Sequence, residues 1–281
     1  MTPERLPSPA GAKGIGIACQ TYSWQMSLDT YRGRLDHITR VVDAVGFPAV
    51  EAEVLMLGER WDAGSVRGQL AGRGLTLAAL CLVEDWRQAT ETGAEQANAD
   101  RAIDAVASMP GAVLNLCQMP GADRADLSER QAAALRCVDA IAKRAADRGV
   151  HCTFHPNSPP GSVFRTADDY DVLLGGLPAG VGFTPDLGHI VKGGMDPLEV
   201  LRTYWERVDH LHVKDIDGRG EWARTGEGVI DFPAVGRFLA DAGYRGWIVM
   251  EDESPHAERD PDGAAAHNAE YARTHLLPVL T

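Results

Sequence analysis

The chain has 281 residues, of which 44% are hydrophobic and 24% are charged, and its formal net charge is −13. This composition is typical of a soluble globular protein, and the length suits one large α/β barrel or two smaller domains. The acidic balance and the lack of a basic run argue against a surface for nucleic acid or anionic membrane. No apolar run reaches the length of a membrane span, and the N-terminus lacks the hydrophobic core of a signal peptide.

Five cysteines are scattered along the chain without a CxxC motif. Most lie in apolar runs, so we interpret them as reduced core residues and expect a cytoplasmic protein. Residues 1–13 are Pro-rich and polar, which predicts a flexible N-terminal tail. We therefore expect a single catalytic domain over residues 14–281.

Strand-like apolar runs alternate with helical patterns along the whole chain. The runs begin near Ile15, Ala49, Thr76, Ala112, Val150, Val181, Val208 and Trp247. Helical patterns lie between and after them, over residues 31–45, 63–73, 94–109, 128–148, 166–174, 196–207, 231–242 and 263–277. The runs start about 33 residues apart, which is the length of one βα unit. This repeat predicts a single (β/α)₈ TIM barrel, and the lack of a Gly-rich phosphate loop after the first strand disfavours an open doubly wound sheet.

A TIM barrel places its active site at the carboxyl ends of its strands. The sixth, seventh and eighth predicted strands end in Asp186, His212 and Glu251. Neighbouring strands lie about 4.8 Å apart, so these side chains can converge on one ion, with His155 from the fifth strand as candidate fourth ligand. Carboxylate and imidazole ligands without a thiolate suit Mn²⁺, our first choice, or Mg²⁺, Co²⁺ or Zn²⁺. An ion cluster without metal is the alternative.

Alternation along the seventh strand predicts which of its side chains point into the barrel. Leu211 and Val213 share the face that packs on helices, so His210, His212 and Lys214 share the inward face. Burying three such polar groups without partners would be costly, which favours a functional cluster.

Four further residues are candidate substrate contacts: Glu51, Trp24, Asn157 and Arg224. Glu51 lies on the inward face of the second strand, with a solvated loop acid as the alternative. Trp24 is either a sugar-stacking platform or a packing residue, and Arg224 is either an anion or hydroxyl contact or an ordinary surface arginine. Glu53 is interpreted as a plain residue of the barrel mouth.

Several motifs resemble those of the xylose-isomerase-like TIM-barrel superfamily and occur in the same order. Asp186, Gly188 and His189 resemble its DxGH signature, and the run 210–215 (HLHVKD) resembles HxHxKD. The run 226–232 (GEGVIDF) resembles its GxGxxDF loop, and Glu251 matches its last-strand glutamate. The resemblance spans the chain from about residue 15 to residue 280. The superfamily includes sugar phosphate isomerases and epimerases, inosose dehydratases and apurinic-site endonucleases.

The resemblance implies a divalent ion held by Asp186, His212, Glu251 and one residue of the fifth strand. In the epimerases of the superfamily that residue is a glutamate, whereas this chain has His155. A histidine here is closer to the inosose-dehydratase branch, which has YHxH, although Asn157 replaces the second histidine.

The implied chemistry is proton transfer next to a carbonyl through a metal-stabilised enediolate, which predicts a sugar (phosphate) isomerase or epimerase. Glu251 is the candidate base, His155 or His189 its acid partner, and Lys214 orients the substrate. One alternative is an inosose-dehydratase-like lyase that eliminates water from a keto-inositol or keto-sugar, and another is a non-catalytic, metal-free barrel. The expected partner is a sugar or polyol, with a homo-oligomer as a further expectation from the resemblance.

Overall fold

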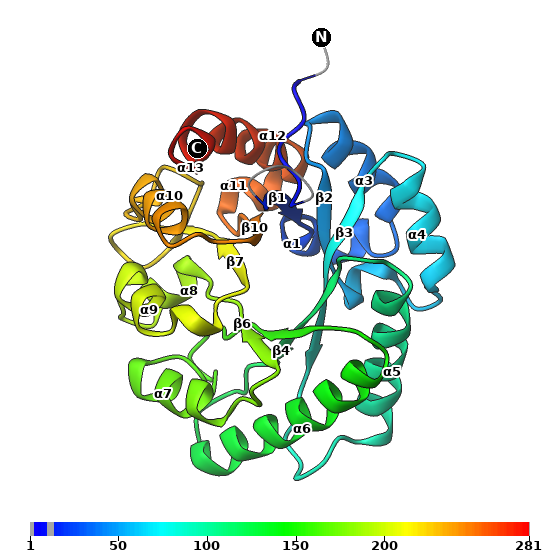
Figure 1. Cartoon of the computed structure of the whole chain (residues 1–281), viewed down its shortest axis with the longest axis vertical. Helices are drawn as coiled ribbons and strands as arrows, with labels where there is room; N and C mark the ends of the chain where they lie inside the picture. The colour runs from blue at the N-terminus through cyan, green and yellow to red at the C-terminus, as the bar shows by residue number, and fades with distance from the viewer. Residues whose placement is uncertain (1–2, 10–13, 281) are drawn as a thin grey trace.

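The computed structural model describes residues 3–9 and 14–280, which form a barrel of parallel strands enclosed by helices (Figure 1). The strand order is β6-β5-β4-β3-β2-β1-β10-β7, and every neighbouring pair is parallel. Two β-bridges, Phe183 with Val208 and Asp186 with His212, join the two ends of this sheet and close the barrel. The prediction of a single TIM barrel is confirmed.

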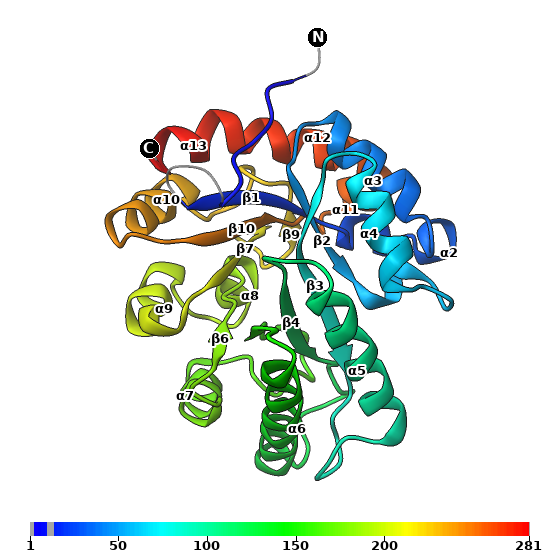
Figure 2. The same cartoon turned by 45° about the vertical axis from the view of Figure 1, so that its right-hand side comes forward.

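The barrel strands begin within two residues of the predicted positions. They are β1 (Ile15–Gln20), β2 (Ala49–Glu53), β3 (Thr76–Glu84), β4 (Val113–Gln118), β5 (Cys152–Phe154), β6 (Val181–Phe183), β7 (His210–Val213) and β10 (Gly246–Met250). The larger outer helices are α3 (Leu35–Ala44), α4 (Ala63–Ala71), α5 (Gly93–Ala107), α6 (Leu127–Asp147), α7 (Ala167–Gly176), α9 (Pro197–Thr203), α10 (Phe232–Asp241) and α12 (Pro261–Tyr271). Near the C-terminus α12 continues through η3 (Ala272–Leu276) into α13 (Leu277–Leu280). The red helices at the C-terminal end lie beside the blue N-terminal elements in both views (Figures 1 and 2).

The loops contain short elements that the sequence pattern did not predict. They are α1 (Tyr22–Gln25), α2 (Leu28–Tyr31), η1 (Val54–Leu57), α8 (Leu187–Lys192), the ribbon β8 (Asp215–Ile216) with β9 (Trp222–Ala223), and α11 (Pro255–Arg259). Each is too short to show a helical or alternating period, which explains why sequence periodicity misses them. The helix predicted over residues 196–207 is divided into α9 and the single turn η2 (Trp205–Arg207).

The segment predicted as a flexible tail is partly packed on the barrel. Residues 1–2 and 10–13 lie outside the described residues. Leu6, however, is buried, and its amide donates a hydrogen bond of 2.8 Å to the Gly46 carbonyl. The Pro7 carbonyl accepts from the Ile17 amide at 3.0 Å. These contacts fix the segment against the start of β1, so this part of the prediction is corrected.

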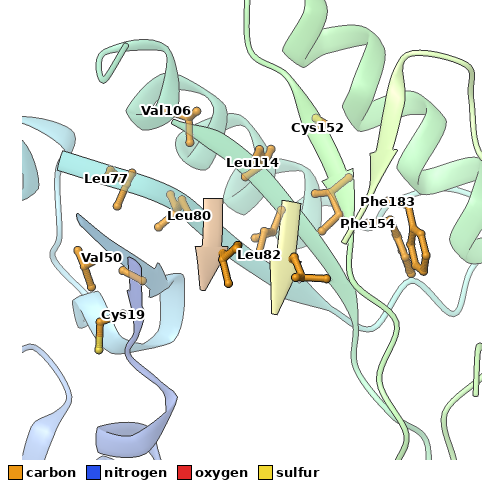
Figure 3. Packing of buried hydrophobic residues seen from close by; sticks show 14 of the residues in the cluster. Cys19, Val50, Leu77, Leu80, Leu82, Val106, Leu114, Cys152, Phe154 and Phe183 are labelled. Carbon is orange, nitrogen blue, oxygen red and sulfur yellow. The ribbon is translucent and has the colours of Figure 1, made fainter. Parts of the chain in front are cut away.

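The interior of the protein has two apolar layers. One lies between the strands and the outer helices, where Leu80, Leu114 and Phe154 project from neighbouring strands and Val106 of α5 packs over them (Figure 3). The other fills the barrel at the amino ends of the strands with Ala18, Ala49, Ala78, Trp247 and Val249. Above this small plug, toward the carboxyl ends, the inward side chains become polar, and this change places the site.

All five cysteines are buried and unpaired, as the sequence reading expected. Among the helices of the described residues, none combines the length and the apolar character that a bilayer crossing requires.

Candidate functional site

Four buried side chains meet inside the barrel at the carboxyl ends of β5, β6, β7 and β10. They are His155, Asp186, His212 and Glu251, and their potential ligand atoms all lie within 4.8 Å of one another. The bridge between Asp186 and His212 fixes the register of β6 against β7, and parallel pairing fixes β10 against β7. The structure therefore brings together the same four residues that the sequence analysis selected.

This cluster fits a divalent cation. Within the described part of the chain, His155 Nε2 and Asp186 Oδ2 are buried without a hydrogen bond partner, and they lie 3.6 Å apart. A buried imidazole nitrogen and a buried carboxylate oxygen without hydrogen bonds cost free energy. The Lys214 ammonium, 3.3 Å from Asp186 Oδ2, offsets part of this cost for the carboxylate, and a cation bound by both atoms would recover the rest. The mixed nitrogen and oxygen set suits the four ions considered above.

Glu51 supports His212 from below. Its carboxylate oxygens each lie 3.1 Å from His212 Nε2, and one of them lies 2.6 Å from His210 Nε2. The other ring nitrogen of His212, Nδ1, lies 2.7 Å from Glu251. A carboxylate behind a ligating histidine fixes the ring orientation and raises its basicity. Glu51 thus occupies an orienting position, and its carboxylate is fully buried.

These contacts explain the shifted pKa values around His212. Burial alone would lower the pKa of His212, but Glu51 and then Glu251 raise it to about 10. Burial alone would raise the pKa of Glu51, but His212 and His210 hold it well below its usual range. A proton on the His212 ring is therefore strongly stabilised by the two carboxylates.

Lys214 neutralises the carboxylates of the cluster. Its ammonium lies 3.3 Å from Asp186, 3.1 Å from Glu251 and 2.5 Å from Glu253. Burial alone would lower the pKa of Lys214, but Asp186 and Glu251 raise it well above its usual range. The side chain is 1% exposed, so the ammonium lies beneath the surface of the site. Its predicted role in orienting substrate remains a prediction.

A chain of hydrogen bonds runs from Lys214 through His189 to Ser158. The Lys214 ammonium lies 2.9 Å from His189 Nε2, and His189 Nδ1 lies 2.7 Å from the Ser158 hydroxyl. Burial and the nearby ammonium hold the pKa of His189 well below its usual range, so the ring is neutral. The ammonium can only donate, so Nε2 accepts and Nδ1 carries the proton that it donates to Ser158. The hydroxyl hydrogen of Ser158 is then directed elsewhere.

A cavity of about 730 Å³ opens above the cluster. Its polar lining includes His155, Asn157, Ser158, His189 and Glu251. The volume lies within the range of small-molecule sites. This places the cluster where a small substrate can reach it.

Four further carboxyl groups line the cavity, and two of them, Glu53 and Glu253, are almost fully buried. Burial is the largest effect on both and raises the pKa of each to about 7. Gln25 donates a hydrogen bond of 2.9 Å to Glu53. Such groups can exchange protons near neutral pH. Glu53 lies at the barrel mouth, as we predicted, and this pKa adds a capacity for proton exchange that the sequence analysis did not assign to it. Its signal was available, because alternation in β2 places it on the same inward face as Glu51.

Of the four predicted substrate contacts, Asn157 lines the cavity and the other three do not. Asn157 lines the cavity and donates a hydrogen bond of 2.7 Å to the Gln118 carbonyl. Glu51 lies below the cavity, and Trp24 is fully buried in α1, where its ring nitrogen donates to Asp262 at 2.7 Å. Arg224 lies outside the cavity lining and pairs with Glu227 at 3.6 Å. Ser158 was missed, because a serine in a loop carries no periodic signal.

The fold and the cluster together define a (β/α)₈ barrel with a candidate divalent-metal site at the carboxyl ends of its strands. The chain belongs to the family described as "Xylose isomerase-like TIM barrel", whose model matches residues 13–275. This match confirms the resemblance seen in the sequence motifs.

Individual relatives match the chain at low sequence identity and over part of its length. The chain is 33% identical over 150 residues to inosose dehydratase 1 of Bacillus cereus, covering 47% of this chain and 48% of the relative. The chain thus spans about half the length of the curated relatives it matches.

Solved structures share the fold over nearly the whole chain. A sugar phosphate isomerase/epimerase from Parabacteroides distasonis has a TM-score of 0.71 at 19% identity and covers 98% of each chain. The IOLI protein with a binding zinc atom has a TM-score of 0.71 at 13% identity, covering 94% of this chain and 98% of that one. At such identities the likeness establishes the fold alone.

Proposed function

We propose that this protein is a divalent-metal-dependent enzyme that moves a proton next to a carbonyl group of a sugar or polyol. The main support is the four-residue cluster, in which buried His155 Nε2 and Asp186 Oδ2 have no hydrogen bond partner in the described chain. A bound ion would polarise the carbonyl oxygen of the substrate and so acidify the neighbouring C–H bond. Mn²⁺ is our first choice, with Mg²⁺, Co²⁺ and Zn²⁺ as the other candidates.

The side chains around the cavity divide the remaining work. Asp186, His212, Glu251 and His155 would hold the ion. Glu251 is also the candidate base, and His155, in place of holding the ion, is the candidate acid, because both line the cavity. His189, the other predicted acid, is neutral and donates its ring proton to Ser158, so it is assigned to positioning the Lys214 ammonium. Lys214 and His212 keep Glu251 ionised, because they outweigh its burial and lower its pKa to about 2.

Elimination of water from a keto-inositol or keto-sugar is the reaction that we favour. A base removes the proton next to the carbonyl, the bond to the β-hydroxyl breaks, and an acid protonates the leaving oxygen to release water. Two features support it: strand β5 ends in His155 where a two-glutamate epimerase has its second carboxylate, and a relative at 33% identity is named inosose dehydratase.

Isomerisation or epimerisation is the second candidate, and the carboxyl groups of Glu53 and Glu253 support it. Both line the same cavity as Glu251, so a second carboxyl group that returns a proton to the substrate is within the site. In this reaction the proton is returned and no bond to oxygen breaks.

Metal analysis tests the proposal as a whole. The purified protein is expected to bind close to one divalent ion per chain after dialysis against Mn²⁺ and then against metal-free buffer. Stoichiometry near zero for all four candidate ions would instead support the metal-free barrel. Turnover of a keto-inositol in D₂O then separates the reactions, since elimination produces enone absorbance and epimerisation exchanges deuterium into the sugar without it.

A further inference from the structure

The cavity has an apolar side that the proposed chemistry does not use. Four large hydrophobic side chains are exposed among the described residues, and two of them, Leu55 at 40% and Met119 at 47%, line this one cavity. Val54, Pro120, Pro159 and Pro160 line it beside them. Exposed apolar groups gathered at one place on a protein mark a binding surface.

This apolar side lies across the cavity from the candidate metal ligands. Leu55 follows β2, Met119 follows β4 and the two prolines follow β5, whereas the ligands come from the ends of β5, β6, β7 and β10. The strand order places β2, β3 and β4 together on one part of the barrel, as the blue, cyan and green strands with these labels show in Figures 1 and 2. A ligand that reaches the cluster with one end therefore has its other end beside Leu55 and Met119.

Backbone hydrogen bonds hold this side in place. The Met119 amide donates to the Glu84 carbonyl at 2.8 Å, and the Gly121 amide donates to the Gly161 carbonyl at 3.1 Å, which ties the loops after β4 and β5 together. The contact is so close that a Cβ on Gly161 would lie 1.8 Å from the Gly121 oxygen. The apolar side is thus preformed, as substrate pockets usually are.

The positive charges near this side are already engaged. The Arg101 guanidinium stacks over Trp61 at 4.2 Å and donates to the Glu59 carbonyl at 3.4 Å. Arg32 pairs with the Glu59 carboxylate at 3.9 Å. With carboxylates also present in the lining, this arrangement suits an uncharged apolar group better than a phosphate.

The geometry points to a subsite for an apolar substituent of the substrate, formed by Leu55, Met119, Pro159 and Pro160. This inference rests on the proposed function and narrows its substrate to a keto-sugar or keto-polyol that carries an alkyl or aryl group, as in a glycoside. The polar end binds at the metal ligands and the apolar group covers the two exposed side chains.

Two glycosides that differ only in this group test the subsite. Phenyl and methyl 3-keto-β-D-glucopyranoside, which both carry the carbonyl group of the proposed substrate, are titrated by calorimetry into the full chain loaded with Mn²⁺. The phenyl glycoside is expected to bind about tenfold more tightly, because its ring removes more apolar surface from water. In the variants Met119→Ser and Leu55→Ser/Met119→Ser the ratio is expected to fall toward one.

Val172→Ser is the matched control, because Val172 is 44% exposed on α7 and lies outside the cavity lining. It should leave the phenyl-to-methyl ratio unchanged. Equal affinities in the unmodified protein, no binding of either glycoside, or a ratio that survives loss of both side chains would overturn the subsite. A ratio that survives while the variants change the mass measured by light scattering would assign the patch to a contact between copies.

The experiments distinguish failure of the subsite from failure of the proposed reaction. Turnover of a keto-inositol without any phenyl preference would remove only the subsite. A phenyl preference without turnover of keto-sugars or keto-inositols would remove the proposed reaction and leave an apolar ligand site.

Discussion

The two ends of the barrel interior use the same strands in opposite ways. On β10, Trp247 and Val249 fill the amino end with apolar volume, and two residues later Glu251 joins the ionic cluster. On β2, Ala49 belongs to the plug and Glu51 lies under His212. Along both strands, the side chains that point into the barrel thus change from apolar to charged within one or two successive inward positions.

The difference shows where this protein gains stability and where it gives stability up. Apolar burial at the amino end contributes about 25 cal/mol per Å² of surface removed from water. At the carboxyl end, Lys214 is surrounded by carboxylates, and buried ion pairs of this kind often contribute little net stability because of desolvation. Changes at the two ends should therefore separate function from folding.

The largest effect is expected from Asp186→Asn, which keeps the shape of the side chain and removes a ligand charge. Removing even an outer partner of a metal ligand typically costs about 10–100-fold in affinity, so loss of a ligand should weaken binding by at least about 100-fold. Titration with Mn²⁺ measures it. Asp209→Asn is the control, since Asp209 directly precedes β7 at the amino end of the barrel and pairs with His151. Equal losses in both variants would contradict the assignment of the site to the carboxyl end.

At the other end, Trp247→Ala should destabilise the fold and spare the site. Trp247 is 7% exposed and packs against Gly16, so its removal leaves a cavity in the plug. Substitutions of this kind cost about 3–5 kcal/mol in free energy of unfolding. Denaturant titration gives that value, and Mn²⁺ affinity of the folded protein should stay unchanged. A fall in affinity as large as that of Asp186→Asn would show that the two ends are coupled.

Glu51→Gln tests where the apolar end of the barrel interior gives way to the charged end, because on β2 Glu51 is the first inward residue after Ala49 of the apolar plug. The amide of glutamine has one acceptor oxygen and no charge, so it cannot accept from His210 and His212 together, and the orientation of His212 weakens. We expect Mn²⁺ affinity to fall by about 10–100-fold. Calorimetric titration checks this value. An unchanged affinity would mean that Glu51 serves packing alone.

Ser158→Ala removes the hydroxyl at the end of the Lys214–His189 chain. A lost neutral hydrogen bond is worth about 1 kcal/mol, so kcat/KM should fall by about fivefold to tenfold, mainly through KM. Mn²⁺ affinity should not change. Nitrogen NMR of His189 should still report the proton on Nδ1, because Lys214 occupies Nε2. A tautomer change in the variant would show that Ser158, and not Lys214, sets it.

The smallest effect is expected from the pair of His151 and Asp209 at the amino end. The hydrogen bond to Asp209 outweighs burial and raises the pKa of His151. A raised folded-state pKa gives stability that is complete below the unfolded value of about 6.5 and is lost as pH rises through the folded value. His151 is about half exposed, so the pair contributes under about 1 kcal/mol. Unfolding of Asp209→Asn between about pH 5 and pH 9 should lack this decline.

The sequence predicted the fold well because its signals are local. Strand starts followed from apolar runs between helical patterns, and the inward face of β7 followed from the alternation of Leu211 and Val213 with His210 and His212. The four candidate ligands followed because neighbouring strands in a barrel end at the same edge.

Side chains whose surroundings come from distant strands could not be predicted in this way. Glu51 was predicted to contact substrate, yet a register shift between β2 and β3 and the histidines of β7 place it below the cavity. Trp24 follows β1, but the turn of α1 directs its ring toward Asp262, 238 residues later in the chain. Neither contact affects local periodicity.

The sequence by itself determined the number of strands, their inward faces and the ligand types at their ends, because periodicity and residue chemistry are properties of short segments. Only the tertiary structure decided the depth at which each side chain lies inside the barrel. This depth sets which carboxylate lies behind His212 and which carboxyl groups line the cavity. It also lets Lys214 connect to Ser158 through His189. Depth depends on strand register and barrel closure, which bring together segments that lie far apart in the chain.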